Sequence, residues 1–187
     1  MTDKTTKQAI GRYSKHKGDR AEREVAKLLG KFFLDDEKSF ARFGNEVAGR
    51  IPGDVGIFIK DNMPLTLKLW DKFPFSIEIK NREDWDILSL INNPKTSVIT
   101  EFWNQTEQEA KRFNKIPILI LKKRFQPYYC VLLNKKSEFE NPKNNFLFSM
   151  NNKLFYFFKL EDFIEINKNC KFVTDLKMFL ETEKVGG

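Results

Sequence analysis

The stretch FPFSIEIKNREDW, residues 73–85, carries a carboxylate and an amine two positions apart, at Glu78 and Lys80. Its centre, from Ser76 to Lys80, alternates polar and apolar residues, which predicts a half-buried strand with its isoleucines on one face. Glu78 and Lys80 then share the other face, about 7 Å apart along the backbone. Such a pair is either a surface ion pair or half of a metal-dependent site that cleaves phosphodiester bonds.

The composition of the chain argues against several other kinds of active site. His16 is the only histidine and lies in a polar, basic segment, which argues against a Ser-His-Asp triad and against His-ligated zinc. The sequence contains neither GxGxxG nor GxxxxGKS/T, the glycine-rich motifs that bind nucleotide phosphates. Carboxylate, lysine and amide groups remain, and oxygen ligands of this kind suit Mg²⁺ or Mn²⁺.

The charge of the chain indicates what kind of partner it binds. A net charge of +7 and a pI near 9.3 favour a polyanion, most simply nucleic acid, over the alternative of a merely soluble basic protein. No apolar run approaches the length of a membrane span, and the N-terminus lacks the apolar region of a secretory signal. The only two cysteines, Cys130 and Cys170, do not make a disulfide framework, so we expect a reduced, cytoplasmic protein without membrane contact.

A helix is expected to bring a further carboxylate towards this strand. The segment 19–33 has apolar residues at helical spacing, and Asp19 and Glu22 stand at its start in the arrangement of a capping box. The apolar stripe consists of Ala21, Val25, Leu28, Leu29 and Phe32. At 100° per residue, Glu22 lies roughly 65° from the centre of the stripe, at the edge of the buried face. Glu22 could therefore face a neighbouring sheet, or only stabilise the helix dipole, which the spacing alone favours.

An arginine and a glycine-rich loop follow the helix. Residues 39–43 predict a short strand that carries Arg42, and the loop GNEVAGRIPGD, which contains Arg50, comes directly after it. Glycines in such a loop allow the backbone to approach a phosphate closely.

Asp54 closes this loop and precedes the apolar run Val55–Ile59, a second expected strand. A lone aspartate at the start of a strand is usually a turn residue. However, the segment 60–72 is expected to turn the chain, and antiparallel pairing across it brings Asp54 to Glu78 and Lys80. Two carboxylates that close repel each other unless a cation joins them, so this arrangement favours a metal site.

The remaining elements up to residue 133 predict a mixed sheet flanked by helices, an α/β (α+β) fold. Residues 100–114 form an expected helix, with Gln105 in its first turn and an apolar face made of Trp103, Thr106, Ala110 and Phe113. Residues 116–121 and 128–133 are expected strands.

Three segments are expected along the chain: a mobile basic arm at 1–17, a core at 18–133 and a C-terminal extension at 134–187 packed on the core. The extension contains short aromatic, strand-like runs and two helical stretches. Its phenylalanines are expected to fill a hydrophobic core; a surface for base stacking or for a subunit contact is the alternative.

The ordered set of these motifs resembles a known family. Glu22 in KGDRAERE, Asp54 in PGDVGIF and Glu78-Ile-Lys80 in IEIK look like the PD-(D/E)xK nuclease superfamily. The layout is most similar to the archaeal-type Holliday junction resolvases and their phage-encoded relatives, which also share an IP-apolar-Lys strand, here NKIPILILKK, and a Trp-x-Gln, here Trp103-Asn-Gln105. The resemblance spans about residues 17–122. Gly53-Asp54 stands where the superfamily has Pro-Asp.

The resemblance implies a restriction-endonuclease-like core and a metal-dependent endonuclease. Asp54 and Glu78 would bind one or two Mg²⁺ ions, or Mn²⁺ in their place, helped by the carbonyl of Ile79. Lys80 would orient the attacking water and stabilise the developing charge. Glu22 would reach the site directly or through a water, and Gln105 would touch it by analogy.

The resemblance also implies DNA contacts and an oligomeric state. Arg23 and Arg42 match positions that contact the DNA backbone in such enzymes, and Lys17, Arg50 and Arg82 are added because they lie near the motifs. The family acts as homodimers on four-way junctions, recognised by shape and phosphates. If the protein is phage-encoded, it is expected to act in the cytoplasm of the host cell.

Two other functions are compatible with the same residues. The chain could be a PD-(D/E)xK endonuclease that acts on linear duplex, forks or foreign DNA. It could also be a non-catalytic DNA-binding protein on this scaffold, although the presence of all three central motif residues argues against that.

Overall fold

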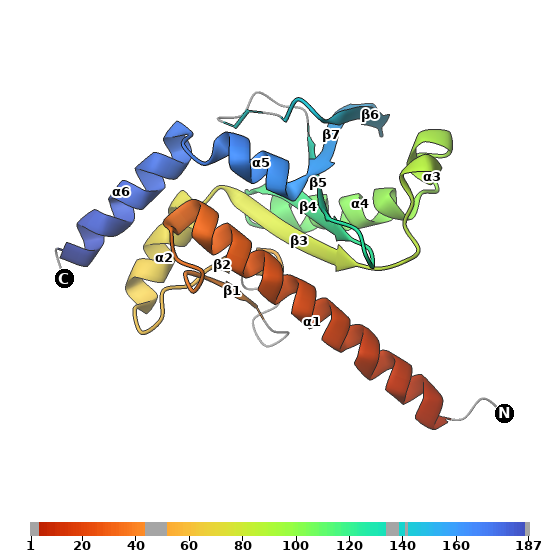
Figure 1. Cartoon of the computed structure of the whole chain (residues 1–187), viewed down its shortest axis with the longest axis horizontal. Helices are drawn as coiled ribbons and strands as arrows, with labels where there is room; N and C mark the ends of the chain where they lie inside the picture. The colour runs from red at the N-terminus through yellow and green to blue at the C-terminus, as the bar shows by residue number, and fades with distance from the viewer. Residues whose placement is uncertain (1–3, 44–51, 134–138, 141, 186–187) are drawn as a thin grey trace.

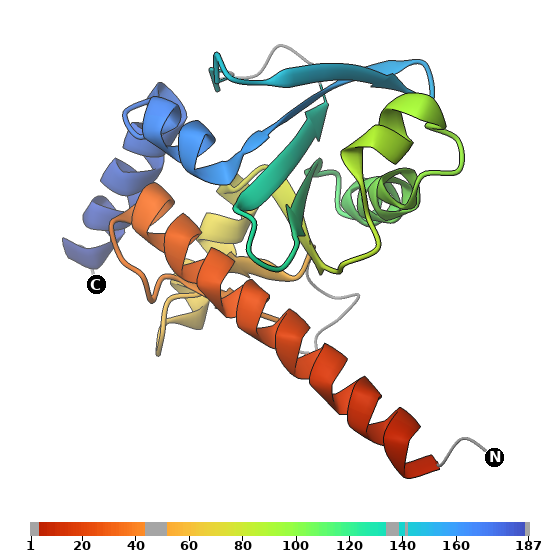
Figure 2. The ribbon, with the colours of Figure 1, turned by 45° about the vertical axis from the view of Figure 1, so that its right-hand side comes forward.

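The computed structural model describes residues 4–43, 52–133, 139–140 and 142–185. These residues form a mixed sheet with helices on both faces, which confirms the expected fold class (Figures 1 and 2). The helices are α1 (Lys4–Leu34), α2 (Met63–Lys72), α3 (Ile87–Asn92), α4 (Val98–Arg112), α5 (Leu160–Asn167) and α6 (Lys171–Val185). The strands are β1 (Phe40–Arg42), β2 (Val55–Ile57), β3 (Phe75–Asn81), β4 (Ile116–Lys122), β5 (Tyr128–Leu133), β6 (Phe146–Met150) and β7 (Lys153–Lys159).

The sheet has the order β1-β2-β3-β4-β5-β7-β6. All neighbouring strands are antiparallel except β3 and β4, which run parallel and are joined by the crossover through α3 and α4. The two parallel strands have the most extensive pairing, from Phe75 beside Ile116 to Asn81 beside Lys122. They form the centre of the sheet, and β3 is the strand that carries the Glu-x-Lys motif.

Two hydrophobic cores lie on the opposite faces of the sheet. Alternate residues of β3 and β4, such as Ile77 and Ile118, pack with α1, α2, α5 and α6 in the first core. The intervening β4 residues, Leu119 and Leu121, pack with α3 and α4 in the second, where Trp103 is fully buried. The period of two in a strand sends neighbouring side chains to opposite faces, so both faces of these central strands are covered.

The first helix is longer than the sequence pattern predicts. We expected a mobile arm up to residue 17 and a helix from Asp19, but α1 begins at Lys4 and its N-terminal part projects beyond the sheet (Figures 1 and 2). Residues 4–17 are rich in good helix formers but carry no apolar stripe, so propensity favoured a helix where periodicity gave no signal. The expected stripe is buried except for Leu28, which is 36% exposed.

A second difference concerns residues 60–72, which were expected to form only a turn. The chain forms α2 there because Asn62 and Pro64 start a helix. The Asn62 side chain accepts a hydrogen bond from the Leu65 backbone N–H at 3.0 Å, and Pro64 lies in the first turn. Leu65 and Leu69 bury one face of α2 in the first core.

The C-terminal third extends the sheet and covers its first face. β7 pairs with β5, and β6 pairs with the outer edge of β7. Phe163 of α5 and Leu176 of α6 belong to the first core, which also includes Phe32 of α1. The phenylalanines of this segment are mostly core residues, as expected, although Phe146 is 40% exposed.

Candidate active site

The aspartate at the start of β2 is fixed by the backbone of β3. The Asp54 N–H donates to the Ile77 carbonyl at 2.8 Å, and the Ile79 N–H donates to Oδ2 of Asp54 at 2.7 Å. Val55 stands beside Ile77 in the antiparallel register, which puts Asp54 opposite Glu78. The expected meeting of these two carboxylates across β2 and β3 is therefore present.

Gly53 explains why the chain departs from Pro-Asp at this motif. Its φ is +80°, in the region that favours glycine. A Cβ at this position would lie 2.4 Å from the Ile77 carbonyl oxygen and 2.6 Å from the Ile77 nitrogen. Only a residue without a side chain allows the backbone at position 53 to lie against β3, with the Asp54 carboxylate at the Ile79 N–H.

Glu78 and Lys80 form an ion pair on the same face of β3. Lys80 Nζ lies 2.6 Å from Oε1 of Glu78, and both side chains are largely shielded, with exposures of 21% and 17%. The Phe102 ring of α4 lies 5.9 Å from Lys80 Nζ. The expected side-by-side placement is confirmed, and it occurs in a partly buried setting rather than on an open surface.

Asp54 carries the strongest electrostatic signal of the site. Its pKa is raised from 3.8 to about 7, mainly by burial, then by the negative charge of Glu78, with a smaller contribution from Glu22. The Ile79 N–H and the charge of Lys80 act in the opposite direction. A carboxyl group that is buried beside other carboxylates is stabilised by a cation as well as by a proton.

Glu22 is held at the edge of this group by an arginine. Arg42 Nε donates to Oε2 of Glu22 at 2.7 Å, and Arg42 Nη2 donates to Oδ1 of Asp19 at 2.7 Å. The alternative reading of Glu22, a helix-terminal carboxylate in a capping box, was wrong because α1 begins at Lys4 and Glu22 lies in its interior. The ion pairs connect α1 to β1 next to Asp54.

The donor set fits a small divalent cation held by few protein ligands. Among the residues that the structure describes, no group of three or more His, Cys, Asp or Glu side chains could hold a metal ion. Asp54 and Glu78 supply two carboxylates, and Mg²⁺ is commonly bound by one or two carboxylates together with waters and substrate phosphates. The buried, like-charged pair fits such an ion.

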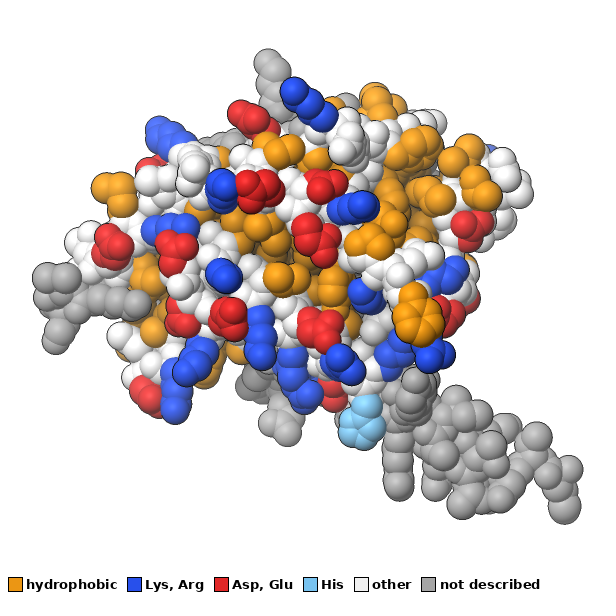
Figure 3. Space-filling view, in the orientation of Figure 1, with side chains coloured by type: hydrophobic (Ala, Val, Ile, Leu, Met, Phe, Trp, Pro, Cys, Tyr) orange, Lys and Arg blue, Asp and Glu red, His pale blue; other side chains and the backbone are white. Residues whose placement is uncertain are grey.

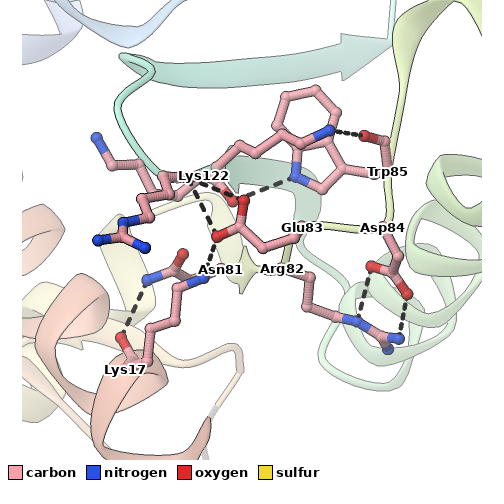
Figure 4. Close-up of polar contacts among 9 residues, drawn as sticks. Lys17, Asn81, Arg82, Glu83, Asp84, Trp85 and Lys122 are labelled. Atoms are coloured by element: carbon pink, nitrogen blue, oxygen red, sulfur yellow. Dashed lines mark hydrogen bonds and ion pairs between the residues drawn. The ribbon is translucent and has the colours of Figure 1, made fainter.

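The other predicted basic residues have different surroundings. Lys17 is paired with Glu83, and Arg82 with Asp84, whereas Arg23 is exposed on α1 (Figure 4). The loop residue Arg50 lies outside the described residues.

The amide predicted to touch the site stands apart from its central residues. Gln105 is exposed on α4, and none of the described hydrogen bonds joins it to Asp54, Glu78 or Lys80. The α4 residue that does lie near Lys80 is Phe102, three positions before Gln105.

Two contacting residues were missed by the sequence reasoning. The Asn81 Nδ2 donates to the Lys17 carbonyl at 3.0 Å and so ties α1 to the end of β3 (Figure 4). Glu83 accepts from Lys17 and also from the Arg124 backbone N–H at 3.3 Å, which links α1 to the β4–β5 turn. Both residues lie within FPFSIEIKNREDW, but nothing in that stretch identifies their distant partners.

The mixed sheet, with Asp54 opposite the Glu78-x-Lys80 motif, is the arrangement of a PD-(D/E)xK nuclease. A family model described as "Phage putative PDDEXK endonuclease" matches residues 13–184, and the chain belongs to this family. Comparisons with curated proteins and with solved structures gave no match. The matched range includes the C-terminal third, which therefore belongs to the family's fold. Nucleases of this superfamily generally use divalent metal ions.

None of the helices in the described part of the chain is both long and apolar enough to cross a membrane.

Proposed function

We propose that the protein is a Mg²⁺-dependent endonuclease that resolves four-way DNA junctions by hydrolysing phosphodiester bonds. The proposal that the protein hydrolyses phosphodiester bonds rests on one observation. Asp54 lies opposite Glu78, with Lys80 beside them on a shielded face of the sheet. Family membership supports nuclease activity. The choice of a branched substrate rests on the resemblance of the ordered motifs to junction resolvases.

Asp54 and Glu78 would hold the metal ion, with the Ile79 carbonyl as an additional ligand; Mn²⁺ would be accepted in place of Mg²⁺. The ion supplies Lewis-acid activation of the scissile phosphate. The raised pKa of Asp54 makes its carboxylate less favourable than that of a free aspartate, and a cation held by Asp54 and Glu78 would stabilise the carboxylate form.

Lys80 has a role that follows from its ion pair. Its ammonium neutralises Glu78 in the metal-free arrangement, 2.6 Å away. When Glu78 binds a cation instead, Lys80 is available to hydrogen-bond the attacking water and to stabilise the negative charge that develops on the phosphate. Arg42 keeps the Glu22 carboxylate at the edge of the site, and Gln105 would approach from α4.

The net charge of +7 provides the attraction for the DNA backbone. Figure 3 shows several Lys and Arg side chains, with acidic side chains among them, near the histidine, which is His16 of α1. We propose that Lys17, Arg23, Arg42, Arg50 and Arg82 contact phosphates. A homodimer would place two sites on one junction, as two symmetric cuts require, and would act in the cytoplasm of a phage-infected host.

Cleavage of a synthetic four-way junction and of a linear duplex of the same sequence, with Mg²⁺ or with EDTA, tests this function. We expect paired, symmetric nicks in the junction only, and only with Mg²⁺. Light scattering should give the mass of a dimer for the free protein. For the junction complex it should give the mass of one dimer with the DNA. Equal cleavage of both DNAs would replace junction resolution with a general DNA endonuclease, and absence of cleavage of any DNA would refute the enzymatic proposal.

A further inference from the structure

The turn between β4 and β5 presents an aromatic side chain to solvent. Phe125 is 92% exposed, the most exposed large hydrophobic residue in the part of the chain that the structure describes. The turn is closed by a hydrogen bond from the Gln126 N–H to the Lys123 carbonyl at 3.1 Å. Phe125 is the second of the two central residues.

The backbone at this position is unfavourable for phenylalanine. Its φ is +62°, while Arg124 before it has no positive φ, which is the pattern of a type II turn. Such turns favour glycine or asparagine at this position, and a bulky residue in the left-handed region is strained. Because the ring is almost fully exposed, no burial within the chain offsets the strain. A residue that adds strain and buries nothing suggests a role in binding.

The turn that carries Phe125 is anchored from two sides, so its backbone is held in a defined place. Both carboxylate oxygens of Glu83 lie 3.3 Å from the Arg124 backbone N–H, and Glu83 is itself paired with Lys17 of α1 (Figure 4). On the other side, Lys123 Nζ donates to the Trp85 carbonyl at 3.0 Å. A binding group held on a rigid support loses little entropy when it binds.

A positive charge lies beside the exposed ring, and two more basic residues precede it in the chain. The Arg124 guanidinium lies 4.7 Å from the centre of the Phe125 ring. Lys122 and Lys123 immediately precede Arg124 in the chain. Aromatic rings that stack on bases, next to cations that contact phosphates, are the usual elements of a surface for unpaired nucleic acid. An apolar protein partner would gain nothing from these charges.

The turn lies close to the catalytic strand. Lys80 of β3 stands beside Leu121 of β4, and Phe125 follows Leu121 by four residues. At about 3.3 Å per residue along a strand and about 4.8 Å between neighbouring strands, the Cα atom of Phe125 lies within roughly 18 Å of the Cα atom of Lys80. DNA advances about 3.4 Å per base pair, so this separation corresponds to a few nucleotides.

We propose that Phe125 stacks on a DNA base that is unpaired or unstacked near the cleaved phosphodiester, as happens at a branch point. This role rests on the proposed nuclease function and adds to it a determinant of substrate shape. In a continuous duplex every base is already stacked and offers no free face. The ring therefore favours branched over linear DNA.

Binding measured in EDTA, without cleavage, tests the role of the ring. We expect Phe125→Ala to weaken binding of a four-way junction about tenfold and to leave binding of a linear duplex unchanged, because base stacking on an aromatic side chain contributes affinity only where a base is free. Phe125→Trp should retain junction binding. Met178→Ala, a change at a residue of α6 that is 60% exposed, is the matched control and should bind as the wild type does.

A second measurement checks the strain. Phe125→Gly should lose junction affinity like Phe125→Ala while raising the Tm by about 2 °C, because glycine accepts the positive φ.

Several results would overturn the proposal. Unchanged junction affinity of Phe125→Ala would exclude stacking, and so would loss of affinity in Phe125→Trp. Equal weakening on junction and linear duplex would show that the ring does not recognise a free base. If Phe125→Ala changed the mass of the free protein from dimer to monomer, the ring would be a subunit contact instead. Because binding is measured without metal, failure of the wild type to cleave any DNA would refute the nuclease proposal and leave this comparison valid.

Discussion

Replacing Asp54 with asparagine should raise the free energy of unfolding of the metal-free protein relative to that of the wild type. This difference should increase as the pH rises. The variant keeps the shape of the side chain and an oxygen that accepts the hydrogen bond from the Ile79 N–H. It removes the charge that is unfavourable at this position, where burial and Glu78 raise the pKa from 3.8 to about 7.

The sign and size of the effect follow from the raised pKa. A group whose pKa is higher in the folded state contributes stability below its unfolded pKa, and this stability is lost as the pH rises through the folded pKa. Each pKa unit corresponds to about 1.4 kcal/mol, so the change from 3.8 to about 7 corresponds to about 4 kcal/mol. Relative to Asp54→Asn, the wild type in EDTA should therefore lose up to about 4 kcal/mol of its free energy of unfolding between pH 4 and pH 8.

Urea unfolding of both proteins in EDTA, at pH values from 4 to 8, measures this difference. Titrating groups that do not interact with Asp54 are shared by the two proteins and largely cancel in the comparison. Asp175→Asn, at an exposed position on α6, is the control and should follow the wild type at every pH. Added Mg²⁺ should stabilise the wild type at pH 8 and have little effect on Asp54→Asn. If the difference in the free energy of unfolding between the wild type and Asp54→Asn stayed constant from pH 4 to pH 8, the assignment of a raised pKa to Asp54 would be wrong.

Two further substitutions test the support of the site. Arg42→Ala should lower the cleavage rate at least tenfold while lowering the Tm by only a few degrees, because it frees the Glu22 carboxylate but removes ion pairs that are partly exposed; loss of the folded state in circular dichroism would mean that Arg42 is structural. Gly53→Ala should lower the Tm by about 5 °C or more and abolish cleavage, because its Cβ would lie 2.4 Å from the Ile77 carbonyl oxygen. Wild-type stability and activity of Gly53→Ala would refute the close approach of this loop to β3.

The centre of the site could be predicted from the sequence because it depends on local patterns. Alternation in residues 76–80 placed Glu78 and Lys80 on one face, and the apolar run after Asp54 identified the strand that pairs with it. Antiparallel pairing of the two strands then indicated which residues meet, and this pairing is present although helix α2, rather than a turn, connects the strands.

Contacts between distant segments could not be predicted in this way. The ion pairs of Arg42 with Asp19 and Glu22 depend on how α1 crosses β1, which no periodicity encodes. The same holds for the Glu83 carboxylate, which joins Lys17 to the β4–β5 turn.

The errors in secondary structure have local causes. The early start of α1 was missed because residues 4–17 have helix propensity without an apolar stripe. α2 was missed because Asn62 and Pro64 were interpreted as turn residues, although both residue types also occur at helix starts. Burial of Leu65 and Leu69 on one face favours the helix.

The central claim, that Asp54, Glu78 and Lys80 form a nuclease site, is tested most directly by comparing DNA cleavage and DNA binding in the same variants. Cleavage of a four-way junction in Mg²⁺ and binding of that junction in EDTA should be measured for the wild type, Asp54→Asn and Lys80→Ala. We predict that both variants bind the junction with wild-type affinity and cut it about a hundredfold to a thousandfold more slowly, the loss seen when a group that stabilises transition-state charge is removed. Normal cleavage by both variants would contradict the assignment of this site.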